Sequence, residues 1–449
     1  MSALKPIQRD YMESKTTTFN IDTLIQIVKK GGKVKTGVNV YSKSGALLLD
    51  KDVLIDHEKP LLVIQQSGLI DIPFDSGATG GIWDESGTPI QFKAGKTEEN
   101  QGPNLQISKE LESRVKKISE LKKEASKKYQ KAKENIHQVI SDIRKTGGQF
   151  DYETVEATVT DLVGFITLND NAFSFLTKEI LSYDEYLYHH SINVCTIGTA
   201  ILKKFNEQFG SETKRISRNK MFQISIGLFL HDVGKVLIPD HILNKPGRLT
   251  SEEFALVKTH SYEKGIMILD KNAIHSTAIR DIVKYHHGAI QPDESNCYPG
   301  VISPEDQPIY LKICKLADIY DAMTSKRCYK DAFNPVGVVT EIVRKYAQKD
   351  RMLRSLLHSF IKAIGIYPAG SIVQLKNGQL GYVLDSEGPL VVPFADAQRI
   401  PFNAALPPID MADESVQSSD LAIDGTKPLL SPIDTYHLLP EHLKSVSPE

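Results

Sequence analysis

Several histidine and aspartate residues in the middle of the chain are of the types that bind metal ions. The adjacent pair His286 and His287 ends a helix-like run and precedes a polar loop that closes on Cys297-Tyr298-Pro299-Gly300. One such pair could be an accident of packing. Its meaning therefore depends on whether the rest of the chain supplies partners of suitable chemistry.

A first partner lies in DEYLYHHSINVCTIGTAI, residues 184–201. Helical periodicity places His190 on one stripe with Leu187 and Val194, so its side chain is expected to point into the protein. A lone inward histidine is more often a hydrogen-bonded core residue than a ligand. His190 counts as a candidate only together with others.

A stronger signal is ISIGLFLHDVGKVLIPD, residues 224–240, where an apolar run ends in His231-Asp232 and Lys235 follows. Burying an unpaired carboxylate costs several kcal/mol, so a buried His-Asp pair needs a counter-charge. A metal ion is a strong one. The adjacency would let His231 serve one metal while Asp232 bridges two.

Two further helices carry inward polar groups. Thr250 and Glu253 have the spacing of a capping box, and His260 in the helix that they open projects into the interior. In QPIYLKICKLADIYDAMTSKRCYK, residues 307–330, Asp318 and Asp321 lie on the apolar stripe of a helix. Carboxylates there make sense as a ligand and its hydrogen-bonding partner.

Together these residues exceed what one metal can use. A mixed set of nitrogen and oxygen ligands suits iron, manganese or zinc. Two metals roughly 3.5 to 4 Å apart generate a nucleophile at neutral pH and hold a phosphoryl group for in-line attack. The pattern therefore favours phosphoester hydrolysis. The candidate ligands are His190, His231, Asp232, His260, His286, His287 and Asp318.

The segments FLHDVGKVLIPDHILNKPGRLTSEEF, HHSINV and LADIYDAMTSKRCY, with the His286-His287 pair, resemble the HD-GYP branch of the HD phosphohydrolase superfamily. Members of this branch hydrolyse cyclic di-GMP. The resemblance covers about residues 150–366, and the added His260 and the histidine doublet are marks of the branch. It implies a mainly α fold with an all-helical HD-type metal-hydrolase domain.

Carried onto this sequence, the resemblance implies that all seven candidates are metal ligands and that the metals are two divalent ions, iron or manganese. Some members bind a third metal through a glutamate four residues before the first histidine, where this chain has Tyr186. Asp232 and Lys235 would act in catalysis, with Lys235 on the scissile phosphate, and Asp321 would support a ligand. Tyr298, Arg327 and Lys330 would contact the substrate.

The loop after the histidine pair departs from the family pattern. Gly288 stands in place of a glutamate, the loop before Tyr298 is about three residues longer, and Cys297 replaces the glycine of Gly-Tyr-Pro. Cys328 also replaces the proline of the usual Arg-Pro-Tyr. Glycine permits positive φ, so we expect cysteine at 297 to carry a backbone cost.

Three functions stay open at this point. The first is an active phosphodiesterase that converts cyclic di-GMP to pGpG or GMP in bacterial signalling. The second is a metal-containing protein that binds a cyclic dinucleotide with little or no turnover, which the altered loop motivates. The third is a hydrolase for another phosphorylated small molecule, or a protein-binding adaptor. Signalling proteins are expected as further partners.

Composition narrows the setting. The formal net charge of −2 offers no basic field for a nucleic acid polymer. The first residues have no apolar core of a signal peptide, and no window resembles a membrane span, so we expect a cytoplasmic protein without a membrane partner. The four cysteines include no CxxC pair, which argues against a zinc ribbon and a disulfide scaffold.

The 449 residues predict several domains. Strand-like runs at Val38–Tyr41 and Leu61–Ile64 indicate an α/β accessory module, followed by a linker from Ser76 to about residue 103. The periodicity of residues 105–145 predicts an amphipathic helix, either a connector packed on the next domain or a dimerising stalk. Asn377-Gly378 predicts a β-hairpin. The expected parts are 1–100, 101–148, 149–367, a small β subdomain at 368–406 and an extended tail at 407–449.

Overall fold

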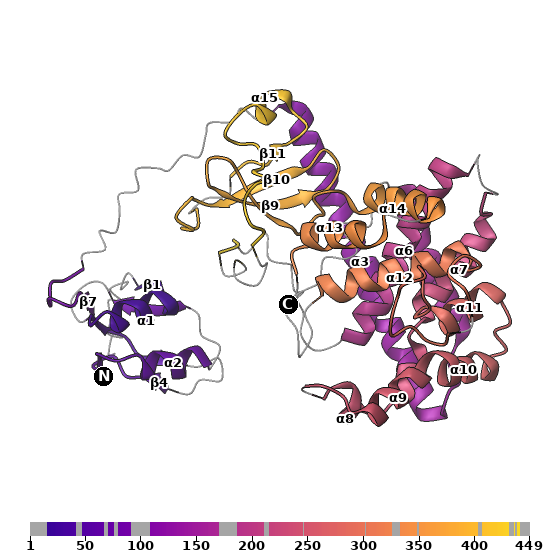
Figure 1. Cartoon of the computed structure of the whole chain (residues 1–449). Helices are drawn as coiled ribbons and strands as arrows, with labels where there is room; N and C mark the ends of the chain where they lie inside the picture. Colours follow the sequence, from indigo (N-terminus) through magenta and orange to yellow (C-terminus); the bar gives the residue numbers. More distant parts are fainter. Residues whose placement is uncertain are drawn as a thin grey trace, which may run out of the picture. The chain divides into compact units, whose positions relative to one another are not determined.

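A computed structural model describes most of the chain, and the described residues fall into two compact units, Met1–Gln101 and Gly102–Glu449 (Figure 1). The described residues are 16–41, 47–66, 71–75, 80–90, 108–169, 186–210, 215–245, 247–300, 302–325, 333–347, 350–402, 406–430, 435 and 438–440.

The first unit is a small α/β body whose paired strands are all antiparallel. Its sheets pair β1 with β6, β3 with β4, and β2 with both β5 and β7. The elements are β1 (Thr16–Asn20), α1 (Ile21–Lys29), β2 (Lys33–Lys35), β3 (Val40–Tyr41), β4 (Leu47–Leu49), β5 (Leu54–Ile55), α2 (Lys59–Gln66), β6 (Asp71–Asp75) and β7 (Gly81–Trp83).

Two predictions in this unit are wrong. The run Leu61–Ile64 is helical and lies in α2, where Leu61 and Ile64 are buried while Val63 is 59% exposed. Burial at a spacing of three is the pattern of a helix rather than of a strand. The predicted linker contains strand β7, because Ile82 is buried in the core of the unit and pairs with Val34.

The second unit is mainly helical. Figure 1 shows α6 in the middle of the bundle, where it packs against α4, α7, α12 and α14. The helices are α3 (Lys109–Thr146), α4 (Tyr152–Leu168), α6 (Tyr186–Phe209), α7 (Arg218–Leu230), the 3₁₀ helix η1 (Val233–Leu237), α8 (Asp240–Leu243), α9 (Ser251–Thr259), the π-helix η2 (His260–Gly265), α10 (Ile266–Lys271), α11 (Thr277–Tyr285), α12 (Ile309–Thr324), α13 (Pro335–Tyr346), α14 (Arg351–Ile364) and α15 (Glu414–Gln417).

The predicted amphipathic helix is α3, which Ser108 caps at its N-terminus and Gly147 ends in a left-handed conformation. Its apolar stripe is buried against the same bundle, with α4 and α6 as neighbours. A dimerising stalk would need this stripe on the outside. The connector interpretation therefore fits, because the stripe is already covered by its own chain.

The C-terminal part is a four-stranded antiparallel sheet in the order β11-β10-β9-β8. The predicted hairpin joins β8 to β9, and Gly378 in its turn has φ 87°. The strands are β8 (Ile372–Gln374), β9 (Leu380–Asp385), β10 (Leu390–Ala395) and β11 (Ile409–Asp410).

The extended tail predicted from residue 407 is wrong for the residues that the structure describes. Strands β9 and β10 are buried on both faces: Leu380 and Val392 pack on the helical core, whereas Val383 and Val391 face Ile409 and its neighbours. Strand β11 and helix α15 cover that second face. The apolar side chains that do so are too widely spaced to stand out among Pro, Ser and Asp.

None of the helices within the described ranges is both long enough and apolar enough to cross a membrane.

Candidate metal centre

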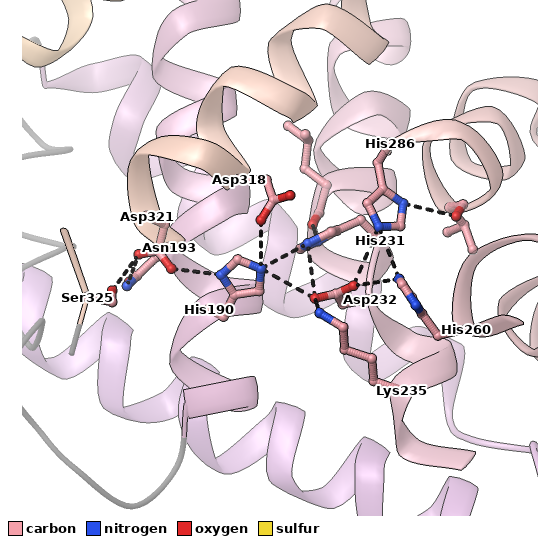
Figure 2. A network of polar contacts seen from close by, with 12 residues as sticks. His190, Asn193, His231, Asp232, Lys235, His260, His286, Asp318, Asp321 and Ser325 are labelled. Atoms are coloured by element: carbon pink, nitrogen blue, oxygen red, sulfur yellow. Dashed lines mark hydrogen bonds and ion pairs between the residues drawn. The ribbon is translucent and has the colours of Figure 1, made fainter. Parts of the chain in front are cut away.

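Candidate ligands from several helices meet in the bundle: Figure 2 shows His190 of α6 and Asp318 of α12 next to residues from helix ends. His231 and His286 are the C-terminal caps of α7 and α11, His260 begins the π-helix η2, and Asp232 precedes η1. Short π-helical segments are frequent at functional sites. Local helix signals thus place each group, while the bundle brings them together.

Four of the histidines donate or share their Nδ1 proton with a fixed oxygen, which leaves Nε2 facing the centre. Such contacts set the tautomer and orientation of ligating histidines. The Nδ1 contacts are His190 to Asp321 Oδ2 at 2.7 Å, His231 to Leu228 O at 2.8 Å, His260 to Val257 O at 2.6 Å and His286 to Ile282 O at 3.1 Å.

The Nε2 atoms converge in two groups that share Asp232. His190 Nε2 lies 3.2 Å from His231 Nε2, and His260 Nε2 lies 3.3 Å from His286 Nε2. Asp232 stands between the groups, with Oδ2 3.3 Å from His190 Nε2 and Oδ1 3.1 Å from His260 Nε2. Two sets of possible ligand atoms can be defined, and within each set the atoms lie within 4.8 Å of one another. One set is His190, His231 and Asp232, and the other is Asp232, His260, His286 and His287.

Two buried atoms in this cluster have no hydrogen bond among the described residues: Asp232 Oδ1 and His287 Nε2. A buried polar atom without a partner is costly, and metal coordination is one way to satisfy it. Asp318 adds a carboxylate 3.3 Å from His190 Nε2. The residues fit metal ions, because lone pairs of nitrogen and oxygen point into one buried space.

Burial and mutual contacts shift the protonation of the cluster. Burial lowers the pKa of His231 to about 3 and holds the pKa of His287 well below its usual value. Burial also opposes ionisation of Asp232, but Lys235 and the neighbouring histidines hold its pKa well below the ordinary range. The result is neutral imidazoles at His231 and His287 near an ionised carboxylate, which is the state that a metal needs.

His190 is the exception. Burial acts against its charge, yet Asp232, Asp318 and Asp321 raise its pKa to about 10. A proton on His190 is therefore the counter-charge to three carboxylates. A bound metal would replace that proton, since ligating imidazole is neutral.

Lys235 lies one helical turn after Asp232 and forms an ion pair with its Oδ2 atom (Figure 2). The lysine side chain is 22% exposed, so its ammonium group lies at the edge of the buried cluster. Gly234 is needed beside it, because a Cβ there would lie 1.9 Å from the carbonyl oxygen of His260. Glycine at position 234 therefore allows η1 to pack closely against η2.

Asp321 extends the hydrogen bonding of the centre beyond His190. Besides His190, its carboxylate accepts hydrogen bonds from Asn193 Nδ2 at 2.7 Å and Ser325 Oγ at 3.1 Å. Asn193 in turn accepts one from the hydroxyl of Tyr129 on helix α3, at 3.3 Å. Sequence reasoning missed Asn193 and Tyr129. Asn193 follows His190 by three residues, so its place on the same helical stripe was the available signal.

Tyr298 lies beside the centre. Its ring centroid is 4.6 Å from that of His287, and its amide donates a hydrogen bond to His287 O at 3.2 Å. Burial raises the pKa of the Tyr298 phenol, which stays protonated. The predicted backbone cost at Cys297 is wrong, because the left-handed residue of the loop is Asn296, with φ 62°. Asparagine tolerates that conformation. Arg327, Cys328 and Lys330 lie outside the described residues.

Comparison with known proteins identifies the class. Residues 187–323 match the family model described as HD domain, so this chain contains an HD domain. It is 30% identical over 259 residues to cyclic di-GMP phosphodiesterase PA4108 of Pseudomonas aeruginosa, covering 58% of each chain. It is 37% identical over 123 residues to 3'3'-cGAMP-specific phosphodiesterase 2 of Vibrio cholerae, covering 27% of this chain and 22% of the relative.

Among solved structures, Bd1817, a HDG"Y"P protein from Bdellovibrio bacteriovorus, aligns with 77% of this chain and 99% of its own, at a TM-score of 0.41 and 15% identity. The family model and the similarity to the curated phosphodiesterases confirm the predicted resemblance to the HD-GYP branch and the mainly α, HD-type fold. The chain aligns with 58% of the first relative's length and 22% of the second's.

Proposed function

We propose that this protein is a metal-dependent phosphodiesterase that hydrolyses cyclic di-GMP to pGpG or GMP in bacterial second-messenger signalling. The observation that supports this proposal best is the sharing of Asp232 by two groups of inward-facing histidines. A carboxylate shared in this way is suited to bridging two metal ions. The similarity to phosphodiesterases of cyclic dinucleotides supports the choice of substrate.

The metals we propose are two divalent ions, iron or manganese. His190, His231 and Asp318 would hold one ion and His260, His286 and His287 the other, with Asp232 between them. Nitrogen and oxygen ligands without thiolate favour these metals over a purely oxygen-bound magnesium. Bound as a pair, they would supply a water-derived nucleophile and hold the phosphodiester for in-line attack.

The residues at the edge of the cluster would handle the substrate. Lys235 would bind the scissile phosphate, because its ammonium group pairs with Asp232 while its side chain is partly exposed. Tyr298 would border the dinucleotide next to His287. We propose further phosphate contacts from Arg327 and Lys330, which follow Ser325 in the chain.

The test is elemental analysis of protein purified without oxygen, followed by chromatography of cyclic di-GMP and its products with the same sample. Two metal ions per chain and conversion to pGpG or GMP are expected. An Asp232→Ala variant is the matched control and should show neither. Metal-loaded protein that leaves cyclic di-GMP intact, with activity on no cyclic dinucleotide, contradicts the proposal.

A second candidate is a metal-containing receptor that binds the dinucleotide without useful turnover. The loop between His287 and Tyr298 favours it, because Gly288 and Cys297 depart from the family pattern. Tight binding of cyclic di-GMP by metal-loaded protein, with no product after prolonged incubation, would support this candidate over the enzyme.

A further inference from the structure

The loop between His287 and Tyr298 contains a buried carboxylate. The side chain of Glu294 is only 5% exposed, although the polar sequence around it is typical of a surface loop. Its Oε2 atom accepts hydrogen bonds from the Ile290 amide at 2.7 Å and from Lys315 Nζ at 3.1 Å. Its Oε1 atom accepts one from the Tyr346 hydroxyl at 2.7 Å. Groups from α12 and α13 therefore hold this loop residue.

Lys315 on α12 connects the two ends of the same loop. Its ammonium donates to the carbonyl oxygen of Gly288 at 2.7 Å and lies 3.4 Å from the sulfur of Cys297. Gly288 directly follows the histidine pair, and Cys297 directly precedes Tyr298. The ammonium group of Lys315, which is neutralised by Glu294, thus contacts both ends of the loop, at Gly288 after His287 and at Cys297 before Tyr298.

Position 288 has no room for a side chain in this arrangement. A Cβ on Gly288 would lie 2.8 Å from Gln307 Nε2 and 2.9 Å from the carbonyl oxygen of Tyr285. The glutamate that the family pattern has at this position is absent. The longer loop brings a different carboxylate, Glu294, back to the cation that contacts Gly288.

We propose that Glu294 and Lys315 are positioning residues that hold Tyr298 against His287 and so shape the face of the site that binds the dinucleotide. This inference rests on the proposed function for its substrate, but the positioning itself does not. A buried ion pair with all of its hydrogen bonds made is rigid, and removal of one partner leaves the other charge uncompensated. Neither residue contacts a candidate metal ligand side chain in the described contacts.

The first measurement is hydrogen exchange across residues 288–300 in the metal-loaded protein without substrate. Glu294→Gln and Lys315→Met should each speed exchange in this loop and leave exchange in α6 and α7 unchanged. Lys345→Met is the matched control. Lys345 also approaches Glu294, at 3.5 Å, but it is 48% exposed, so its loss should leave the loop unchanged.

The second measurement is steady-state hydrolysis of cyclic di-GMP. Both variants should keep full metal content. KM should rise about tenfold while kcat changes by less than about threefold, because an interaction that stabilises the bound substrate and the transition state equally affects KM and not kcat. The double variant should be no worse than the poorer single, because the two residues act as one unit. Tyr346→Phe, which removes only one hydrogen bond, should give a smaller change in the same direction.

Unchanged exchange in the loop of both variants would overturn the positioning role, as would additive effects of the two substitutions or loss of metal. If the wild-type protein hydrolyses no cyclic dinucleotide, the proposed function fails, while the exchange measurement still decides the positioning role. Should Lys315→Met not fold, Glu294→Gln and Tyr346→Phe provide the same comparison.

Discussion

The metal cluster and the loop at residues 288–300 lie side by side but are held in place differently. The ring nitrogens of His231, His260 and His286 are oriented by carbonyl oxygens three or four residues earlier in their own segments. The loop has local hydrogen bonds too, but its buried carboxylate, Glu294, is also held by Lys315 and Tyr346, which come from later helices. Local helix geometry thus orients three of the candidate ligands, whereas His190 and the loop beside Tyr298 depend on tertiary contacts.

The most severe test of this division is Asp232→Ala. Both histidine groups share this carboxylate, so we expect loss of both metals and of all measurable hydrolysis. Elemental analysis and product chromatography on one sample check both outcomes. Retention of two metals per chain would mean that the two groups do not depend on a common bridge.

Lys235→Ala should separate catalysis from metal binding. Loss of a charge that acts on the transition state typically costs about 3 to 4 kcal/mol, so turnover should fall roughly 10²- to 10³-fold with the metals retained. The kcat of metal-loaded variant and wild type is the measurement. If metal is lost instead, Lys235 serves mainly to neutralise Asp232.

Asn193→Ala removes one hydrogen bond from the carboxylate that orients His190. Loss of such supporting partners typically lowers metal affinity or activity about 10- to 100-fold. Competition with a chelator, followed by metal analysis, measures the affinity. Tyr129→Phe, one hydrogen bond further out, is the graded control and should have a smaller effect. Equal losses of metal affinity in the two variants would argue against the proposal that Asn193 supports His190 more directly than Tyr129 does.

Substitutions in the loop should have the smallest effects. Tyr298→Phe should keep both metals and weaken substrate binding, since a neutral hydrogen bond contributes about 0.5 to 1.5 kcal/mol. Cys297→Gly should neither tighten binding nor raise the rate, because the left-handed residue is Asn296. Titration with a hydrolysis-resistant dinucleotide measures both. A clear gain from Cys297→Gly would show that the cysteine restricts the site.

Much of the site follows from sequence, because its signals are local. Helical periodicity placed His190, Asp318 and Asp321 inside the bundle, and the break after the apolar run at Leu230 placed His231 and Asp232 at a helix end. Each of these predictions needs only a few neighbouring residues. Periodicity failed where the helix was short, as at Leu61–Ile64, because a run of four apolar residues fits a strand equally well.

Only the tertiary structure decided which distant groups meet. Glu294 reads as one of several acidic residues in a polar loop, and its burial depends on Lys315 and Tyr346, which lie 21 and 52 residues later. Tyr129 joins the network of His190 through Asn193, which lies 64 residues later in the chain. The covering of the sheet by Ile409 and Met411 is of the same kind. Contacts across such separations depend on how the helices pack, and that packing reflects the whole chain rather than any short segment.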